Sequence, residues 1–119
     1  MRAMERRELG RIGESLAASY LAGCGWDIVD RNVRYREGEI DIVAARGGIL
    51  AFVEVKTRRS VALGSPAETV TWRKQRRIRA LASRYLAEHH PRAHSIRFDV
   101  VDIARGRGGF LVTHLEGAF

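Results

Sequence analysis

The sequence has few of the features that are typical of secreted and membrane proteins. It holds one cysteine and two prolines in 119 residues, and no apolar run approaches the roughly 20 residues that cross a bilayer. The lone Cys24 excludes an internal disulfide. The first residues are charged and no apolar segment follows them, so we expect no secretory signal, no membrane partner and a cytoplasmic location. A chain of this length is expected to fold as one domain over residues 1–119.

Aromatic residues and lysines are also scarce. Aromatic residues make up 8% of the chain and are dispersed, which argues against a stacking platform for single-stranded nucleic acid. Of the 21 basic residues only Lys56 and Lys74 are lysines. Either these two positions favour a compact ammonium over a planar guanidinium, or the choice of lysine at them is due to chance. The net charge of +7 favours a polyanionic partner, because basic domains release counterions when they bind phosphates.

Hydrophobic periodicity predicts an α/β fold in which one helix, three strands, a second helix and two strands follow in order. Gly47-Gly48 marks a hairpin turn between the second and third strands. The second helix is expected to begin near Thr71, and a start at Ser65 is the alternative. The expected helices cover residues 9–24 and about 71–90, the strands cover 26–35, 39–45, 49–57, 95–103 and 110–114, and a basic loop covers 58–64.

The predicted hairpin places three charged residues on one face. If its loop has two or four residues, Asp41 lies directly opposite Glu54, with Cβ atoms about 4.5–5.5 Å apart. Alternation along the strand puts Lys56 on the same face, whereas a loop of odd length would break this register. Two opposed carboxylates repel each other unless a cation compensates, and oxygen ligands suit Mg²⁺ or Mn²⁺. The pattern predicts a metal site; the alternative is a set of exposed charges at the sheet rim.

A lysine interrupts the apolar face of the second predicted helix. Val70, Lys74, Ile78, Leu81 and Tyr85 follow one helical face. A lysine among apolar residues requires a nearby anion, and the acid cluster or a scissile phosphate would serve. Alternatively, the stem of Lys74 lies along the apolar surface and its ammonium reaches water.

Two further acids lie on predicted strands. Glu39 shares a face with Asp41, where it is either an outer acid of the metal site or, more simply, an edge-strand charge. Asp99 lies two residues from Arg97, and no metal-ligand spacing includes it, so we interpret Asp99 as structural.

The residues around the hairpin carry a resemblance to a known superfamily. Gly38-Glu39-Ile40-Asp41, followed by Phe52-Val53-Glu54-Val55-Lys56, resembles the PD-(D/E)xK motif of restriction-endonuclease-like nucleases, with Ile40 in place of the proline. The whole chain is similar to the bacterial YraN-type family, which is distantly similar to archaeal Holliday-junction resolvases. Further segments that carry this likeness are residues 10–14, 31–34, 74–77, 97–101, 114–115 and 118–119.

The resemblance implies a restriction-endonuclease-like core, with a mixed sheet flanked by helices, and a Mg²⁺- or Mn²⁺-dependent nuclease. It implies that Asp41 and Glu54 hold the metal and that Glu14 adds a third acid, although Glu14 is otherwise a plain surface carboxylate. Lys56 would orient or deprotonate the attacking water, or stabilise charge on the phosphate. Lys74 would be a further catalytic residue. Related resolvases are dimers, which suggests a homodimer by analogy.

Arginines flank the predicted metal site in the sequence, and they would form a track for a phosphate backbone. No recognition helix stands out, which favours cleavage directed by the shape of branched or duplex DNA, with RNA still open. Two other functions compete: a nucleic-acid-binding protein with a vestigial nuclease site, and a protein-interaction subunit for an acidic partner. The predicted nucleic-acid contacts are Arg34, Arg36, Arg58, Arg59, Arg73, Gln75, Arg76 and Arg77.

Overall fold

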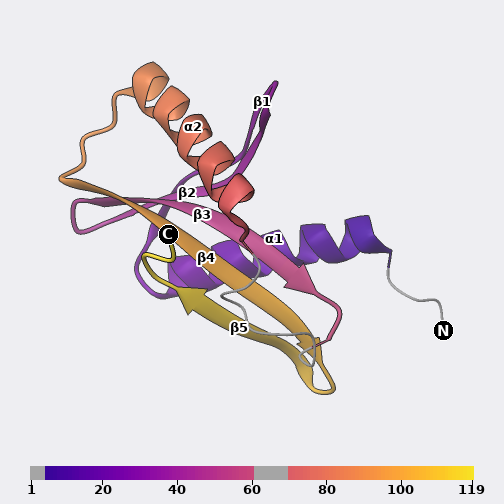
Figure 1. The fold of residues 1–119 in the computed structure, drawn as a ribbon. Coiled ribbons are helices and arrows are strands. Elements are labelled where there is room, and N and C mark those ends of the chain that lie inside the picture. Colours follow the sequence, from indigo (N-terminus) through magenta and orange to yellow (C-terminus); the bar gives the residue numbers. More distant parts are fainter. Residues whose placement is uncertain (1–4, 61–69) are drawn as a thin grey trace.

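The computed structural model describes residues 5–60 and 70–119, and it confirms the predicted order of elements. One helix, three strands, a second helix and two strands form a mixed α/β fold (Figure 1). All five predicted strands are present, at bounds close to those expected from the sequence. The elements are α1 (Arg6–Gly23), β1 (Asp27–Tyr35), β2 (Gly38–Arg46), β3 (Ile49–Arg58), α2 (Trp72–His89), β4 (Ser95–Gly106) and β5 (Gly109–Leu115).

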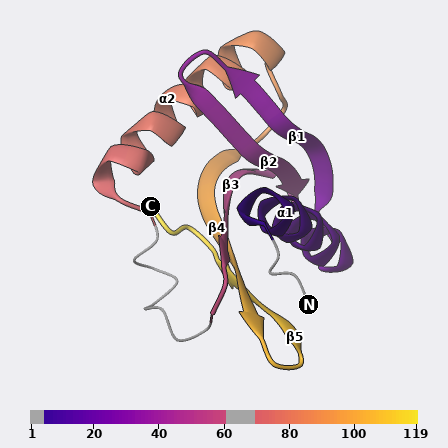
Figure 2. The same cartoon turned by 90° about the vertical axis from the view of Figure 1, so that its right-hand side faces the viewer.

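The five strands form one sheet in the order β1-β2-β3-β4-β5. β3 and β4 run parallel, and the other neighbouring strands run antiparallel. α2 lies in the connection from β3 to β4, because two parallel strands need a crossover. α1 and α2 lie on opposite sides of the strands (Figure 2). This arrangement is compatible with a restriction-endonuclease-like core.

Alternation along β3 divides the hydrophobic core in two. Ala51 and Val53 pack on the α1 side, whereas Leu50 and Phe52 pack on the α2 side. By the same alternation, the α2 side of β3 turns polar at Glu54, as the sequence predicts. The α1 cluster includes Ala17, Leu21, Trp26, Ile42, Ala44, Val101 and Ile103, and the α2 cluster includes Ile40, Val43, Leu81, Ala82 and Tyr85.

A glycine brings α1 close to β3. Gly13 is buried, and a Cβ added there would collide with the side chain of Thr57 on β3. The next residue, Glu14, is thereby held against the end of the sheet at which β3 becomes polar. The helix therefore depends on the missing side chain at Gly13 to position Glu14.

We expect Gly13→Ala to lower the free energy of unfolding by about 1–3 kcal/mol, because the added methyl group overpacks the contact with Thr57. Gly10→Ala is the matched control. A Cβ at Gly10 meets nothing within 4 Å, so this change should raise stability by about 0.5–1 kcal/mol through helix propensity. Urea unfolding of both variants measures the difference, and equal stabilities would contradict the close approach.

The second helix is capped at its predicted start. The Thr71 hydroxyl accepts a hydrogen bond from the Lys74 backbone N–H at 3.2 Å, and α2 begins at Trp72. This confirms the start near Thr71. The alternative start at Ser65 and residues 61–64 of the predicted basic loop lie outside the described residues. Neither α1 nor α2 is long and apolar enough to span a membrane.

Candidate metal centre

The β2–β3 hairpin has the predicted register. Its two-residue loop, Gly47-Gly48, has positive φ at both positions, and Arg46 pairs with Ile49. The ladder continues to the pair Ile42–Val53 and ends there, one pair short of Asp41 and Glu54. Beyond this pair the Val55 N–H donates to Asp41 Oδ2 at 2.8 Å. The carboxylate of Asp41 thus occupies the place at which the two strands stop pairing.

Three acids from two elements meet at this point. The carboxylates of Glu14 on α1 and of Glu39 and Asp41 on β2 each offer an oxygen atom, and these atoms lie within 4.8 Å of one another. Two oxygen ligands on opposite sides of one Mg²⁺ are separated by about 4.2 Å, twice the usual bond length. The cluster is therefore close to ligand spacing. Glu39, for which an outer acid and an edge-strand charge were the two alternatives, thus lies within this cluster.

A half-buried amide joins two of these acids. Asn32 Nδ2 donates to Glu14 Oε2 at 2.8 Å and to Glu39 Oε1 at 2.9 Å. Asn32 has a φ of +51°, which asparagine tolerates better than most residues. Asn32 lies in one of the segments that carry the family likeness, and no role was predicted for it. The available signal was an asparagine within a predicted strand, seven residues before Glu39.

We expect Asn32→Gly to weaken divalent-metal binding by about 10- to 100-fold, because the amide that orients Glu14 and Glu39 is lost. Glycine adopts positive φ without strain, so the backbone of β1 should be kept. Isothermal titration with Mn²⁺ gives the affinity, and circular dichroism checks the fold. An unchanged Mn²⁺ affinity in the folded variant would show that Asn32 does not position these acids.

A cavity of about 270 Å³ opens beside Asp41. Glu54 on β3 and Lys74 on α2 both line it, and Lys74 Nζ lies 3.5 Å from Glu54 Oε1. The predicted need of Lys74 for an anion is thus met by Glu54. The remaining lining residues are Gly38, Glu39, Arg77, Ile78 and Leu81.

The surroundings of Asp41 disfavour its charged form. Burial and the negative charge of Glu54, with further contributions from Glu14 and Glu39, raise the pKa of Asp41 to about 8, although the Val55 N–H opposes the shift. A divalent cation would reverse this effect, since metal ligands bind in their deprotonated form. A donor set made only of carboxylate oxygens suits Mg²⁺ or Mn²⁺.

The structure separates Lys56 and Arg58 from this cavity. Lys56 is half-buried, and its Cα pairs with that of Asp102 on β4, but it is not among the residues that line the cavity. Arg58 Nε and Nη2 donate to the two carboxylate oxygens of Asp102, each at 2.9 Å. Both side chains are nearly inaccessible, with exposed fractions of 10% and 1%. Arg58, which was predicted to contact a phosphate backbone, thus forms a buried ion pair with Asp102.

The other predicted nucleic-acid contacts divide into a half-buried glutamine and exposed arginines. Gln75 Nε2 donates to the Val70 carbonyl at 3.2 Å, so its amide supports the start of α2. Arg34 Nε lies 3.2 Å from Glu39 Oε2, at the edge of the acid cluster. The remaining arginines, all exposed, are Arg36, Arg59, Arg73, Arg76 and Arg77.

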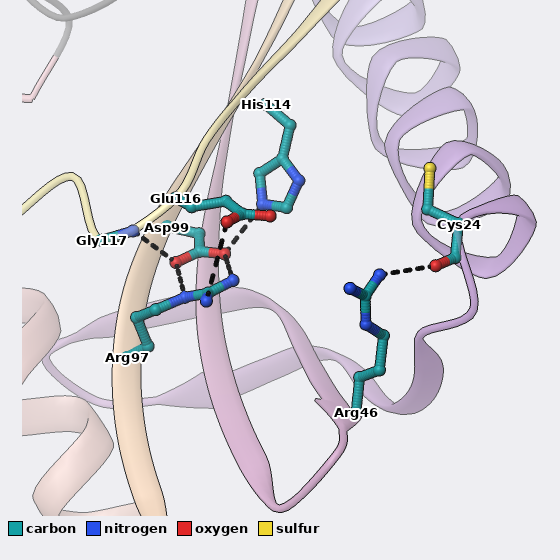
Figure 3. Close-up of polar contacts among 7 residues, drawn as sticks. All are labelled: Cys24, Arg46, Arg97, Asp99, His114, Glu116 and Gly117. Atoms are coloured by element: carbon teal, nitrogen blue, oxygen red, sulfur yellow. Dashed lines mark hydrogen bonds and ion pairs between the residues drawn. The ribbon is translucent and has the colours of Figure 1, made fainter.

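A second polar cluster holds the C-terminal segment to the sheet (Figure 3). Asp99 is fully buried, and its two oxygens accept from Arg97 Nε and Nη2, each at 2.9 Å. His114 Nε2 donates to the same carboxylate at 2.8 Å, and the Gly117 N–H donates at 2.9 Å. All four hydrogen bonds that Asp99 accepts come from residues of the same chain, which agrees with its predicted structural role.

Comparison with known proteins gives the family. Residues 13–103 match the model of the Uncharacterised protein family UPF0102. The chain is 52% identical over 112 residues to a UPF0102 protein of Rhodococcus opacus (strain B4), covering 93% of this chain and 95% of that protein. It is 53% identical over 112 residues to one from Rhodococcus jostii (strain RHA1), at the same coverage. It is 50% identical over 114 residues to one from Symbiobacterium thermophilum, covering 95% and 97%.

The matched segment spans every acid and both lysines of the candidate site. UPF0102 is the same family as the YraN-type family that the sequence resembles. The likeness extends over almost the full length of the chain and of its relatives. The chain therefore belongs to the UPF0102 family.

Proposed function

We propose that the protein is a metal-dependent nuclease that hydrolyses phosphodiester bonds of nucleic acids, with branched or duplex DNA as the preferred substrate. The observation that carries the proposal is the half-buried cluster of Glu14, Glu39 and Asp41, whose carboxylates lie within 4.8 Å of one another. Such a cluster is unfavourable without a cation, and the cavity beside it has room for a phosphate group. The likeness of the hairpin to the PD-(D/E)xK motif supports the same chemistry.

In this proposal Asp41, Glu14 and Glu39 hold Mg²⁺ or Mn²⁺, and Glu54 completes the acidic wall of the cavity. A metal ion held by these residues would supply Lewis-acid stabilisation of the phosphate and would lower the pKa of a bound water. Lys74, held by Glu54, presents an ammonium to the non-bridging phosphate oxygens.

Lys56, two residues beyond Glu54 on the same strand, orients the attacking water in the proposed reaction. Lys56 is half-buried and does not line the cavity, so in this reaction its flexible side chain would have to extend toward the substrate. Lys56→Ala should therefore reduce the cleavage rate more than the affinity for DNA.

A binding protein with a vestigial site is the main competing function. It would bind the same phosphates through the exposed arginines of α2 but would not cleave. The intact acids weigh against it, because a carboxylate cluster with a raised Asp41 pKa is costly to keep without a ligand. An asparagine dedicated to orienting two of these acids weighs against it as well.

The test is a cleavage assay with Mg²⁺ or Mn²⁺ on duplex DNA, single-stranded DNA and a four-way junction, with an RNA duplex as the fourth substrate. The wild type should cleave at least one of them, and the double variant Asp41→Ala, Lys56→Ala should cleave none. Asp27→Ala, which changes an exposed aspartate at the start of β1, is the matched control and should keep full activity. Cleavage that survives the double substitution would refute the assignment.

A further inference from the structure

The most exposed large apolar side chain in residues 5–60 and 70–119 is Trp72, with 73% of its surface accessible. It is the first residue of α2. The other tryptophan, Trp26, is only 4% exposed and packs in the core cluster on the α1 side of the sheet. Tryptophan side chains are highly buried on average, so an indole ring that is mostly exposed to water is unusual. Such rings are enriched at binding surfaces.

The surroundings of Trp72 are cationic. Trp72 lines a surface hollow of about 330 Å³ together with Arg73, Arg76 and Arg77. Arg73 lies in the first turn of α2, which contains no acidic residue, and Arg76 and Arg77 lie in the second turn. Positive charge in the first turn of a helix is unfavourable, and an anion bound there would offset it.

The hollow adjoins the candidate metal centre. Arg77 lines both the hollow and the acidic cavity that contains Asp41 and Glu54. Lys74, two residues after Trp72, contacts Glu54 inside that cavity. A polyanion bound along the start of α2 could therefore contact both Trp72 and the acidic cavity, with Arg77 between them.

We propose that Trp72 stacks on an unpaired base of the nucleic acid, while Arg73, Arg76 and Arg77 contact the adjoining phosphates. The inference rests on the proposed function and narrows its substrate class to branched or partly duplex nucleic acid that has unpaired nucleotides beside the scissile phosphate. An aromatic ring set among basic residues is the usual composition of single-strand binding surfaces. The bases of an intact duplex are already stacked on each other, so the ring gains a partner only where a base is free.

An apolar protein partner fits this surface less well. It would have to desolvate three arginines without compensation. Among the residues that the structure describes, the other strongly exposed apolar side chains, Val29 and Leu111, lie on β1 and β5 at the two edges of the sheet, away from the start of α2. The low aromatic content of the sequence argued against a stacking platform. A single exposed ring is enough to stack on one base when the fold places that ring beside the site.

The test is a binding titration in EDTA, in which no cleavage occurs, with a blunt DNA duplex and the same duplex carrying a single-stranded tail. Tryptophan fluorescence and anisotropy of labelled DNA are recorded together. The tailed duplex should quench the wild-type fluorescence and the blunt duplex should not. Trp72→Ala should raise the Kd for the tailed duplex by about five- to 150-fold and leave the Kd for the blunt duplex unchanged.

Trp72→Phe is the matched control. It keeps a ring that can stack, so the affinity for the tailed duplex should persist, while the quenching disappears because the buried Trp26 remains the only tryptophan. Equal affinities of the wild type and Trp72→Ala for the tailed duplex would overturn the inference, as would failure of both DNAs to bind. Stacking in EDTA combined with no cleavage in Mg²⁺ would support the inference and refute the proposed nuclease activity, so the two failures are distinguishable.

Discussion

Asp41→Asn is expected to reduce metal-dependent cleavage by about a thousandfold or more, because several kcal/mol of transition-state stabilisation would depend on the metal that Asp41 is proposed to hold. The substituted amide would keep the size of the side chain, and its oxygen could still accept the hydrogen bond from the Val55 N–H. The change therefore removes charge rather than shape. The loss of rate should appear at saturating DNA, since the substitution does not change the arginines that are proposed to contact phosphate.

The same substitution should stabilise the metal-free protein at neutral and alkaline pH. The pKa of Asp41 is about 8 in the folded state, above its ordinary value of 3.8. The unfolded chain therefore loses this proton at lower pH than the folded protein does, and the folded wild type loses stability as pH rises from about 4 to 8. An asparagine side chain has no proton to lose, so the variant should escape this penalty.

Urea unfolding in EDTA at a series of pH values measures this effect. The difference in stability between Asp41→Asn and the wild type should grow from pH 4 to pH 8 and then level off. Added Mg²⁺ should stabilise the wild type and not the variant. If the wild type gained stability over this range relative to the variant, the raised pKa of Asp41 and the repulsion among its neighbouring carboxylates would be contradicted.

Asp99→Ala is expected to lower the free energy of unfolding by about 3–5 kcal/mol, the cost of breaking a buried ion pair by removing one partner. Asp99 has no exposed surface, and four hydrogen bonds converge on its two oxygens from Arg97, His114 and Gly117. Removing the carboxylate leaves the Arg97 guanidinium and the Gly117 N–H without their acceptor. The C-terminal residues should then detach from β4 before the sheet unfolds.

The contribution of Asp99 to stability depends on pH with the opposite sign to that of Asp41. Burial alone would raise the pKa of Asp99, but the hydrogen bonds from His114, Arg97 and Gly117 lower it to about 2. The folded pKa lies below the unfolded one, so this contribution is complete above about pH 4 and is lost as pH falls toward 2. Wild-type stability should decline over that range by more than the stability of Asp99→Ala declines.

Glu116→Ala is the matched control for the cluster. Its carboxylate lies 3.8 Å from Arg97 Nη1 and is 57% exposed, so its loss should cost less than about 1 kcal/mol (Figure 3). Chemical denaturation of the two variants at pH 7 separates the buried carboxylate from the exposed one. Similar losses for both would show that burial does not set the strength of this pair.

The parts of the site that follow local rules were predictable from the sequence. The hairpin register follows from the two glycines and the period of two, and it brought Asp41 and Glu54 to the same end of the sheet. The 3.6-residue period placed Lys74 on the buried face of α2, and the structure supplies its anion, Glu54. Each of these predictions needed only the spacing within one element or one turn.

The parts that depend on contacts between distant elements were not predictable. The place of Glu14 in the acid cluster, which the family resemblance had indicated, depends on where α1 crosses the sheet, and the contact of Gly13 with Thr57 decides this. The bridging role of Asn32 depends on a shift of register in β1 and on its positive φ. Arg58 was expected at the surface, but the parallel pairing of β3 with β4 places Asp102 within its reach.

The most direct test of the central claim is single-turnover cleavage of a labelled four-way DNA junction by the wild type and by Asp41→Asn, each with Mg²⁺ and with EDTA. The proposed metal centre predicts cleavage by the wild type in Mg²⁺ only, and none by Asp41→Asn in either condition. Equal cleavage by the two proteins, or wild-type cleavage that persists in EDTA, would contradict it.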